Sequence, residues 1–272
     1  MKRKNKIATG VIIVSVVLLL FIIKKYSPGL LTGSNDPPDL VLKISDVSEG
    51  YPQDNLNDTL LNYTGFSISY NEDYEEPSWV AYILTRKEVQ SGSEVRSENF
   101  RPDKNISRRS ATLKDYSGSG YDRGHMAPAG DMKWSARAMS ESFLLSNMSP
   151  QEPGFNRGIW SRLEAQVREW AIKNDSILVI SGPVLKSIKK YIGKDRVGVP
   201  DYYFKVIADI SAPTYKVIAF VLPNRSSTGD VMNYAVTIDS VERITGYNFF
   251  PLMHDKEMKA RMEKYSYARL WK

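Results

Sequence analysis

The chain has 272 residues, enough for one large or two small domains, and its 42% hydrophobic and 25% charged residues are typical of a globular protein. It contains no cysteine, which excludes disulfide bonds, thiolate zinc sites and cysteine nucleophiles. The formal charge of +6 equals the excess of basic side chains within residues 1–25, and the remainder is neutral with 31 basic and 31 acidic residues, so the high pI indicates no substrate class.

The first predicted element is an uncharged hydrophobic segment, residues 7–23, with the sequence "IATGVIIVSVVLLLFII". As a helix it is about 25 Å long, close to the thickness of a bilayer's hydrocarbon core, and the flanking lysines can extend it. A cleaved signal peptide is the alternative, but no small-x-small site follows in "KKYSPGLLTGS". We expect residues 1–25 to be a cytoplasmic stub and an uncleaved transmembrane signal anchor.

The stronger positive cluster precedes the hydrophobic segment, which predicts that the bulk of the chain lies outside the cytoplasm. A bacterial periplasm or cell surface is favoured over the mitochondrial inner membrane, because no Arg- and Ser-rich presequence is present. Residues 26–62 are rich in Pro, Gly, Asn and Asp, which predicts a flexible linker. Residues 63–272 are the predicted folded domain, long enough for a hydrophobic core without disulfides.

Within this domain, strands and helices are mixed without regular alternation. The predicted strands are residues 65–70, 78–85, 176–184, 202–210 and 215–223, and "SAPT" between the last two predicts a hairpin turn. The predicted helices are residues 135–147, 156–174 and 232–246, with Ser135 and Asn156 as N-caps and Gly246 as a C-cap. This pattern predicts an α+β fold with a mixed or antiparallel sheet rather than a doubly wound α/β fold.

A basic strip lies between the second and third predicted elements of the domain. Residues 96–114 contain six basic and two acidic side chains, although the domain as a whole is neutral. Such strips are often solvated loops. Next to a catalytic residue, however, a basic strip attracts a phosphodiester backbone.

The segment "YDRGHMAPAGD", residues 121–131, holds one of the two histidines in the chain. A lone histidine more often packs in a core than performs chemistry. An ordinary imidazole has a pKa of about 6.5, so at pH 7 His125 can serve as a general base.

His254 lies in a charged C-terminal segment and is predicted to be a surface residue. Two histidines without cysteine do not favour a zinc site.

Polar side chains suited to a magnesium site follow in residues 146–164. In a regular helix Asn156 and Glu164 lie about 80° apart around the axis, so both can lean over one side. Magnesium prefers oxygen ligands and keeps most of its waters, so an amide can bind it while a carboxylate holds a bound water. The alternative is that Asn156 only caps the helix and Glu164 is a surface acid.

Four sequence blocks in order give the chain a strong resemblance to a known family. They are "RSENFRPD", "YDRGHMAPAGDM", "SNMSPQEPGFNRGIWSRLE" and "VERITGYNFFP". With them the chain resembles the DNA/RNA non-specific endonucleases, the ββα-metal nucleases with an Asp-Arg-Gly-His motif, which include secreted bacterial nucleases and mitochondrial endonuclease G. The resemblance covers about residues 65–252 and implies a ββα-metal finger within the domain.

The resemblance implies a role for individual residues. His125 matches the general base, Asn147 the residue that orients it, and Arg96 an arginine that contacts the phosphate near the scissile bond. Asn156 matches the direct magnesium ligand, and Glu164 matches the acid that helps to hold the hydrated metal. The arginines expected to contact nucleic acid are Arg96, Arg101 and Arg123, and Arg101 is the alternative to Arg96 at the scissile phosphate.

The expected function is a magnesium-dependent, sequence-nonspecific endonuclease acting on DNA and RNA, with Mn²⁺ as an alternative metal and 5′-phosphate products. The alternative is a membrane-tethered module for nucleic-acid binding or uptake with little catalysis. A complete set of base, ligand and acid disfavours that alternative, because a binder needs none of them. Monomeric and homodimeric forms both remain open, as does an inhibitor protein partner.

Overall fold

The computed structural model describes residues 50–53, 58–107, 110–209, 216–253, 255–266 and 268–272. The chain separates into two units, Met1–Leu40 and Val41–Lys272, and every described residue belongs to the second. The predicted stub, anchor and most of the linker therefore lie outside the described residues. Within the described ranges, no helix combines the length and the apolar character needed to cross a bilayer.

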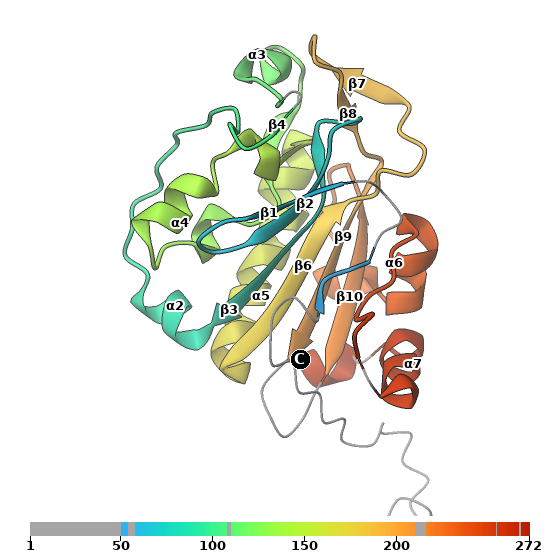
Figure 1. Ribbon diagram of the computed structural model, residues 1–272. Helices are drawn as coiled ribbons and strands as arrows, with labels where there is room; N and C mark the ends of the chain where they lie inside the picture. Colours follow the sequence, from blue (N-terminus) through green and yellow to red (C-terminus); the bar gives the residue numbers. More distant parts are fainter. Residues whose placement is uncertain (1–49, 54–57, 108–109, 210–215, 254, 267) are drawn as a thin grey trace, which may run out of the picture. The chain divides into compact units, whose positions relative to one another are not determined.

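A seven-stranded sheet forms the centre of the second unit, and each neighbouring pair is antiparallel (Figure 1). In spatial order its strands are β1 (Thr59–Asn62), β2 (Ser67–Asn71), β3 (Glu76–Thr85), β6 (Ser176–Pro183), β9 (Tyr202–Asp209), β10 (Val217–Pro223) and β11 (Ala235–Val236). Five of these match predicted strands within a few residues. The turn "SAPT" between β9 and β10 lies outside the described residues. The antiparallel sheet confirms the predicted α+β class.

Strand β1 corrects the end of the predicted linker. Thr59–Asn62 pair with β2 in the register Thr59↔Tyr70 to Asn62↔Ser67. The segment "TLLN" has too few apolar residues to indicate a strand by itself, and the neighbouring strand supplies its hydrogen bonds. Farther upstream, Gln53 forms an isolated antiparallel bridge to Asn248. The folded domain therefore begins before residue 63.

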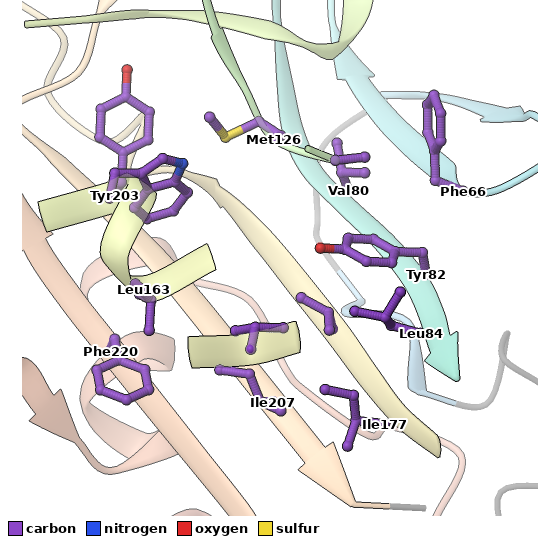
Figure 2. Packing of buried hydrophobic residues seen from close by; sticks show 14 of the residues in the cluster. Phe66, Val80, Tyr82, Leu84, Met126, Leu163, Ile177, Tyr203, Ile207 and Phe220 are labelled. Atoms are coloured by element: carbon purple, nitrogen blue, oxygen red, sulfur yellow. The ribbon is translucent and has the colours of Figure 1, made fainter. Parts of the chain in front are cut away.

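Helix α5 (Ser161–Asn174) packs on one face of the sheet. In Figure 2, Leu163 of α5 lies next to Phe220 of β10, and both belong to one buried cluster with Tyr203 and Ile207 of β9. Phe204 points to the opposite face, where its ring contacts Tyr247 and Phe249. The sheet is thus covered on both faces.

A small ββα unit stands on the α5 side of the sheet. β4 (Asp122–His125) pairs antiparallel with β5 (Met148–Gln151), and the chain then continues through Phe155–Trp160 into α5. The implied ββα finger is therefore present. A second small hairpin consists of β7 (Lys190–Ile192) and β8 (Val197–Val199).

The other α-helices among the described residues are short. They are α2 (Arg86–Ser91), α3 (Leu113–Tyr116), α4 (Ala136–Glu141), α6 (Ile238–Thr245) and α7 (Lys256–Lys264). Ser135 caps α4 as predicted, since its side chain accepts a hydrogen bond from the Ala138 amide. Gly246 ends α6 in the left-handed conformation with φ 84°, also as predicted.

The predicted helix over residues 156–174 is wrong at its start. Phe155–Trp160 form a π-helical turn, and Gly158 within it has φ −101° and ψ −108°, which is outside the helical region. The regular helix therefore begins at Ser161, after this irregular residue. Asn156 is consequently not an N-cap, and the angle of about 80° to Glu164 expected for a regular helix does not apply.

Candidate active site

His125 is the last residue of strand β4, and its ring packs against Phe100 and Phe143. We call these three side chains the aromatic corner. The His125 side chain is 8% exposed, and its ring meets Phe143 edge-on at 4.9 Å between centroids and Phe100 at 5.6 Å. The Nε2 atom is buried and has no hydrogen-bond partner among the described residues. A buried polar atom without a partner costs free energy, and such atoms gather where a ligand is to be bound.

Asn147 fixes the backbone that follows His125. Its Nδ2 donates to the carbonyls of Ala127 and Ser142 at 2.9 and 2.8 Å, and its Oδ1 accepts from the Ala127 amide. Its own carbonyl accepts a hydrogen bond from the Met126 amide at 3.0 Å. Because these bonds are buried, Asn147 holds the histidine segment in one position.

Two of the three predicted arginines reach the same corner. The Arg96 guanidinium lies 4.9 Å from the centroid of Phe143, and the Arg123 guanidinium lies 4.1 Å from that of Phe100. Burial, with the positive fields of both arginines, lowers the pKa of His125 to about 3. The imidazole is therefore neutral at pH 7.

Arg101 is engaged elsewhere. Its Nη1 donates to the carbonyls of Asn99 and Ser140 at 3.2 and 2.9 Å, which ties the preceding loop to α4. Arg96 is exposed and pairs only with the neighbouring Glu98 among the described residues. Of the two candidates for the scissile phosphate, Arg96 is the better placed.

Asn156 is oriented by a carboxylate from β4. Its Nδ2 donates to Asp122 Oδ2 at 2.9 Å, and Arg157 grips the same carboxylate through Nε at 2.8 Å and Nη2 at 2.6 Å. Burial alone would raise the pKa of Asp122, but hydrogen bonds from Arg157 and Asn156 outweigh it and keep the pKa below its ordinary value. With Nδ2 committed, the amide oxygen is left to accept from or ligate another group.

Glu164 lies on α5 near the charged side chains of Lys205, Asp131 and Arg168. Burial raises its pKa to about 7, against the opposing field of Lys205. Lys205 projects from β9, and burial lowers its pKa to about 8 while Glu164 raises it. Arg96 also acts on the pKa of Glu164, as it does on that of His125, so one arginine is electrostatically coupled to both.

The oxygen atoms of this site suit a hard divalent cation. The Asn156 amide oxygen and the Glu164 carboxylate are ligands that magnesium accepts, and the described residues offer no thiolate or second imidazole beside them. Asn156 is linked through Asp122 to the strand that carries His125, three residues farther on, or about 10 Å of extended chain. The donor set therefore fits magnesium.

A family model confirms the resemblance seen in the sequence. The model described as DNA/RNA non-specific endonuclease matches residues 47–256. The chain belongs to this family.

Related proteins of the non-specific endonuclease family support the assignment. Over 206 residues the chain is 35% identical to "Nuclease EXOG, mitochondrial" of Homo sapiens, covering 70% of the chain and 56% of that protein. It is 37% identical to "Nuclease C1" of Cunninghamella echinulata var. echinulata, covering 70% and 82%. The match spans 56% to 62% of the length of three EXOG relatives.

A solved structure shows the same fold. The chain superposes on a chain of the crystal structure of the EndoG/EndoGI complex with a TM-score of 0.70 and 33% identity. The match covers 76% of this chain and 91% of that one. The non-specific endonuclease fold therefore accounts for most of the second unit.

Three features of this site are absent from the sequence predictions. They are the aromatic pair Phe100 and Phe143, the clamp of Arg157 on Asp122, and the buried Lys205. The burial of Lys205 could have been predicted from the sequence, because strand alternation puts it on the same face as the buried Tyr203 and Ile207. The clamp could not, since it joins residues on separate elements.

Proposed function

We propose that this protein is a magnesium-dependent, sequence-nonspecific endonuclease that hydrolyses phosphodiester bonds of DNA and RNA and leaves 5′-phosphates. The observation that carries the proposal is the neutral, unpartnered imidazole of His125 between Arg96 and Arg123. A phosphodiester needs an activated water and positive charge on its oxygens, and this corner offers both.

His125 acts as the base that removes a proton from the attacking water. A free-state pKa of about 3 would make it a weak base, but the two arginines contribute to that value. A bound phosphodiester anion offsets their field, so the proton affinity of the imidazole rises when substrate arrives. Asn147 keeps the histidine segment fixed during the transfer.

Asn156 and Glu164 would hold the divalent cation, with Asn156 as the direct ligand and Glu164 as the acceptor for a metal-bound water. When bound, the cation supplies positive charge for the phosphoryl and leaving oxygens. Arg96 adds a charge-assisted contact to a non-bridging oxygen. None of these contacts reads a base edge, which supports weak sequence preference.

The test uses the full-length chain with supercoiled plasmid DNA and with RNA, in Mg²⁺ and in EDTA. We expect both substrates to be cut in Mg²⁺ only, and His125→Ala to reduce the rate by at least about 10²-fold, the usual contribution of a general base. His254→Ala is the matched control. A His125→Ala variant that still digests plasmid, or tight DNA binding without cleavage in Mg²⁺, Mn²⁺ and Ca²⁺, contradicts the proposal.

We further propose that residues 7–23 anchor the chain in a membrane, with residues 26–62 as a linker and the nuclease domain outside the cytoplasm of a bacterial cell. The uncharged apolar run and its flanking lysines support this. Cell fractionation with protease applied from outside tests it, and recovery of the chain in the cytosol contradicts it. The likeness to EndoG, solved together with EndoGI, supports the proposal of an inhibitor partner.

A further inference from the structure

The β7–β8 hairpin region carries a concentration of positive charge that the predicted site does not use. Residues 186–196 contain a single acid, Asp195, and five exposed cationic side chains, Lys186, Lys189, Lys190, Lys194 and Arg196. The chain beyond residue 25 is neutral overall, so this excess is local. Such a patch creates a positive potential over the surface around it.

These charges are not neutralised by neighbouring acids. Among the described residues, none of the five cations forms an ion pair within 4 Å. The nearby Asp115 is buried and accepts hydrogen bonds from the Asp195 amide at 3.0 Å and from the Thr112 hydroxyl at 2.6 Å. Asp115 therefore binds the hairpin backbone at Asp195 and forms no ion pair with the five cations. The cations stay available to an external anion.

The hairpin is firmly attached to the rest of the fold. Ile192, Val197 and Val199 are buried in one cluster with Leu145 and Met148 from the ββα region. On the other side, the Gly198 amide donates to the Tyr74 carbonyl at 2.9 Å, and the rings of Tyr74 and Tyr191 stack at 6.4 Å. The cations are consequently presented on a packed scaffold rather than on a free loop.

The patch is continuous with the active site. Lys190 Nζ donates to the Tyr121 hydroxyl at 2.9 Å, and Tyr121 directly precedes β4, which carries Arg123 and His125. A surface pocket lies along this path, lined in part by Lys114, Tyr121 and Arg123. Figure 1 shows α3, β4, β7 and β8 at the same end of the molecule. Positive side chains thus run from the catalytic corner to the hairpin.

A polynucleotide suits this surface better than a small anion does. A nucleic acid presents a row of phosphates, one charge per about 1.7 Å of duplex axis, so a strand cleaved at His125 must extend over the neighbouring surface. The patch offers five exposed cations on a surface that continues toward β4. Lysine and arginine contacts to phosphate oxygens give affinity without sequence preference.

We propose that the β7–β8 hairpin, together with Lys114, is a second binding surface for the polynucleotide backbone, several nucleotides away from the scissile linkage. This inference rests on the proposed function, because it takes the substrate to be a nucleic acid. Its consequence is that affinity increases with substrate length until the strand reaches the hairpin.

The test removes three hairpin charges that make no described contact to the catalytic corner. Lys189→Gln, Lys194→Gln and Arg196→Gln are combined in a His125→Ala background, and binding of a duplex of about 30 base pairs is measured from about 0.05 to 0.2 M salt. We expect the dissociation constant to rise about 10-fold or more, and the slope of its logarithm against that of salt to fall by up to about 3. A five-nucleotide fragment binds unchanged.

The matched control removes the same charge from exposed lysines on other elements. The control combines Lys87→Gln, Lys173→Gln and Lys256→Gln. These exposed lysines lie on α2, α5 and α7, which are away from the hairpin in Figure 1. If hairpin and control triples bind equally at every salt concentration, the inference is wrong. It is also wrong if the hairpin triple loses only its binding to anionic phospholipid vesicles.

The binding measurement separates this inference from the proposed function, because it requires no cleavage. A chain that binds DNA through the hairpin without cutting it refutes the proposed function and retains the inference. In the catalytically intact chain, the hairpin triple should raise KM for plasmid about 10-fold with kcat unchanged. A fall in kcat with unaltered KM counts against a binding role.

Discussion

At the scale of single residues, the site depends on keeping one imidazole neutral. Phe100 and Phe143 exclude water from His125, while Arg96 and Arg123 lie against the same two rings. Burial and positive charge both disfavour the imidazolium, so both lower the pKa. The imidazole of His125 therefore stays unprotonated at neutral pH, at a cost to stability in acid.

That cost leads to a prediction about pH and stability. The unfolded imidazole takes up a proton near pH 6.5, whereas the folded one has a pKa of about 3, so unfolding binds a proton between these values. Relative to His125→Asn, the wild-type free energy of unfolding should be unaffected above pH 6.5. It should fall by up to about 1.4 kcal/mol per pH unit as the pH decreases below 6.5. Denaturant titrations of both proteins from pH 8 to pH 4 measure this difference. If their free energies of unfolding change with pH in parallel, the prediction is wrong.

A second prediction concerns the hydrogen bonds that orient Asn156, the proposed metal ligand. Arg157 holds Asp122, and Asp122 holds the amide of Asn156. Arg157→Gln should free the amide to rotate and weaken divalent-cation binding about 10-fold, the usual effect of losing an outer-shell partner. Electron paramagnetic resonance of Mn²⁺ measures the affinity for the cation and requires no cleavage. Arg162→Gln, at another arginine five positions along the chain, is the control, and equal affinities in the two variants would rule out the clamp.

At the scale of elements, the ββα unit depends on close packing between its two strands. Gly124 of β4 lies opposite Ser149, and an added Cβ would come within 2.2 Å of the Gln151 side chain. The Gln151 amide is buried and has no hydrogen-bond partner among the described residues, so it fills space above the glycine. The position of His125 therefore depends on a residue without a side chain next to it.

Gly124→Ala should consequently destabilise the fold by about 1–3 kcal/mol, the usual cost of overpacking a buried site, and reduce cleavage by shifting β4. Thermal unfolding and plasmid digestion measure the two effects. Gly229→Ala is the control, because its nearest neighbour would be 3.8 Å from the new carbon. Shortening the facing side chain with Gln151→Ala should recover part of the stability, and no recovery would show that the loss has another origin.

The elements also show which parts of the fold a sequence predicts. Alternation and length located β3, β6, β9 and β10, because each is buried along most of its length. The residue pattern by itself did not indicate strand β4, because "DRGH" has no apolar alternation and its partner β5 lies far along the chain. Only the family resemblance implied the ββα unit. The irregular turn at Gly158 escaped prediction because the surrounding pattern is helical. Local chemistry predicted caps correctly at Ser135 and Gly246.

In the candidate site, too, local residue patterns were predictable from the sequence, whereas contacts between distant elements were not. The motif and its resemblance supplied His125, Asn147, Asn156, Glu164 and Arg96. The structure places Arg96 against the Phe143 ring that packs on His125, and Asn147 against the backbone that follows His125. What the sequence missed are contacts between elements, such as Asp122 with Arg157. A side chain's partner across space leaves no periodic signal in the chain, whereas its own type and its burial do.

At the scale of the whole molecule, the hydrophobic core and the predicted cation ligands are separate features of the fold. One hydrophobic cluster joins the sheet to α5 and includes Met126, the residue after His125, as Figure 2 shows. The predicted ligands Asn156 and Glu164 lie at the margin of this core and are already held by Asp122 and by charged neighbours. The fold therefore does not need a cation to bury its apolar surface.

Chelation should accordingly stop cleavage without unfolding the protein. In EDTA we expect the far- and near-ultraviolet circular dichroism to be retained while plasmid digestion is lost, and Mg²⁺ in excess to restore the activity in full. A cation that binds only the folded state still stabilises it, by about 2.7 kcal/mol at a concentration 100 times its dissociation constant, so the unfolding midpoint should rise with Mg²⁺. Asn156→Ala should lose this rise, whereas Arg162→Gln should keep it. Loss of near-ultraviolet signal in EDTA would instead make the cation part of the fold, as in small zinc domains that are unfolded without metal.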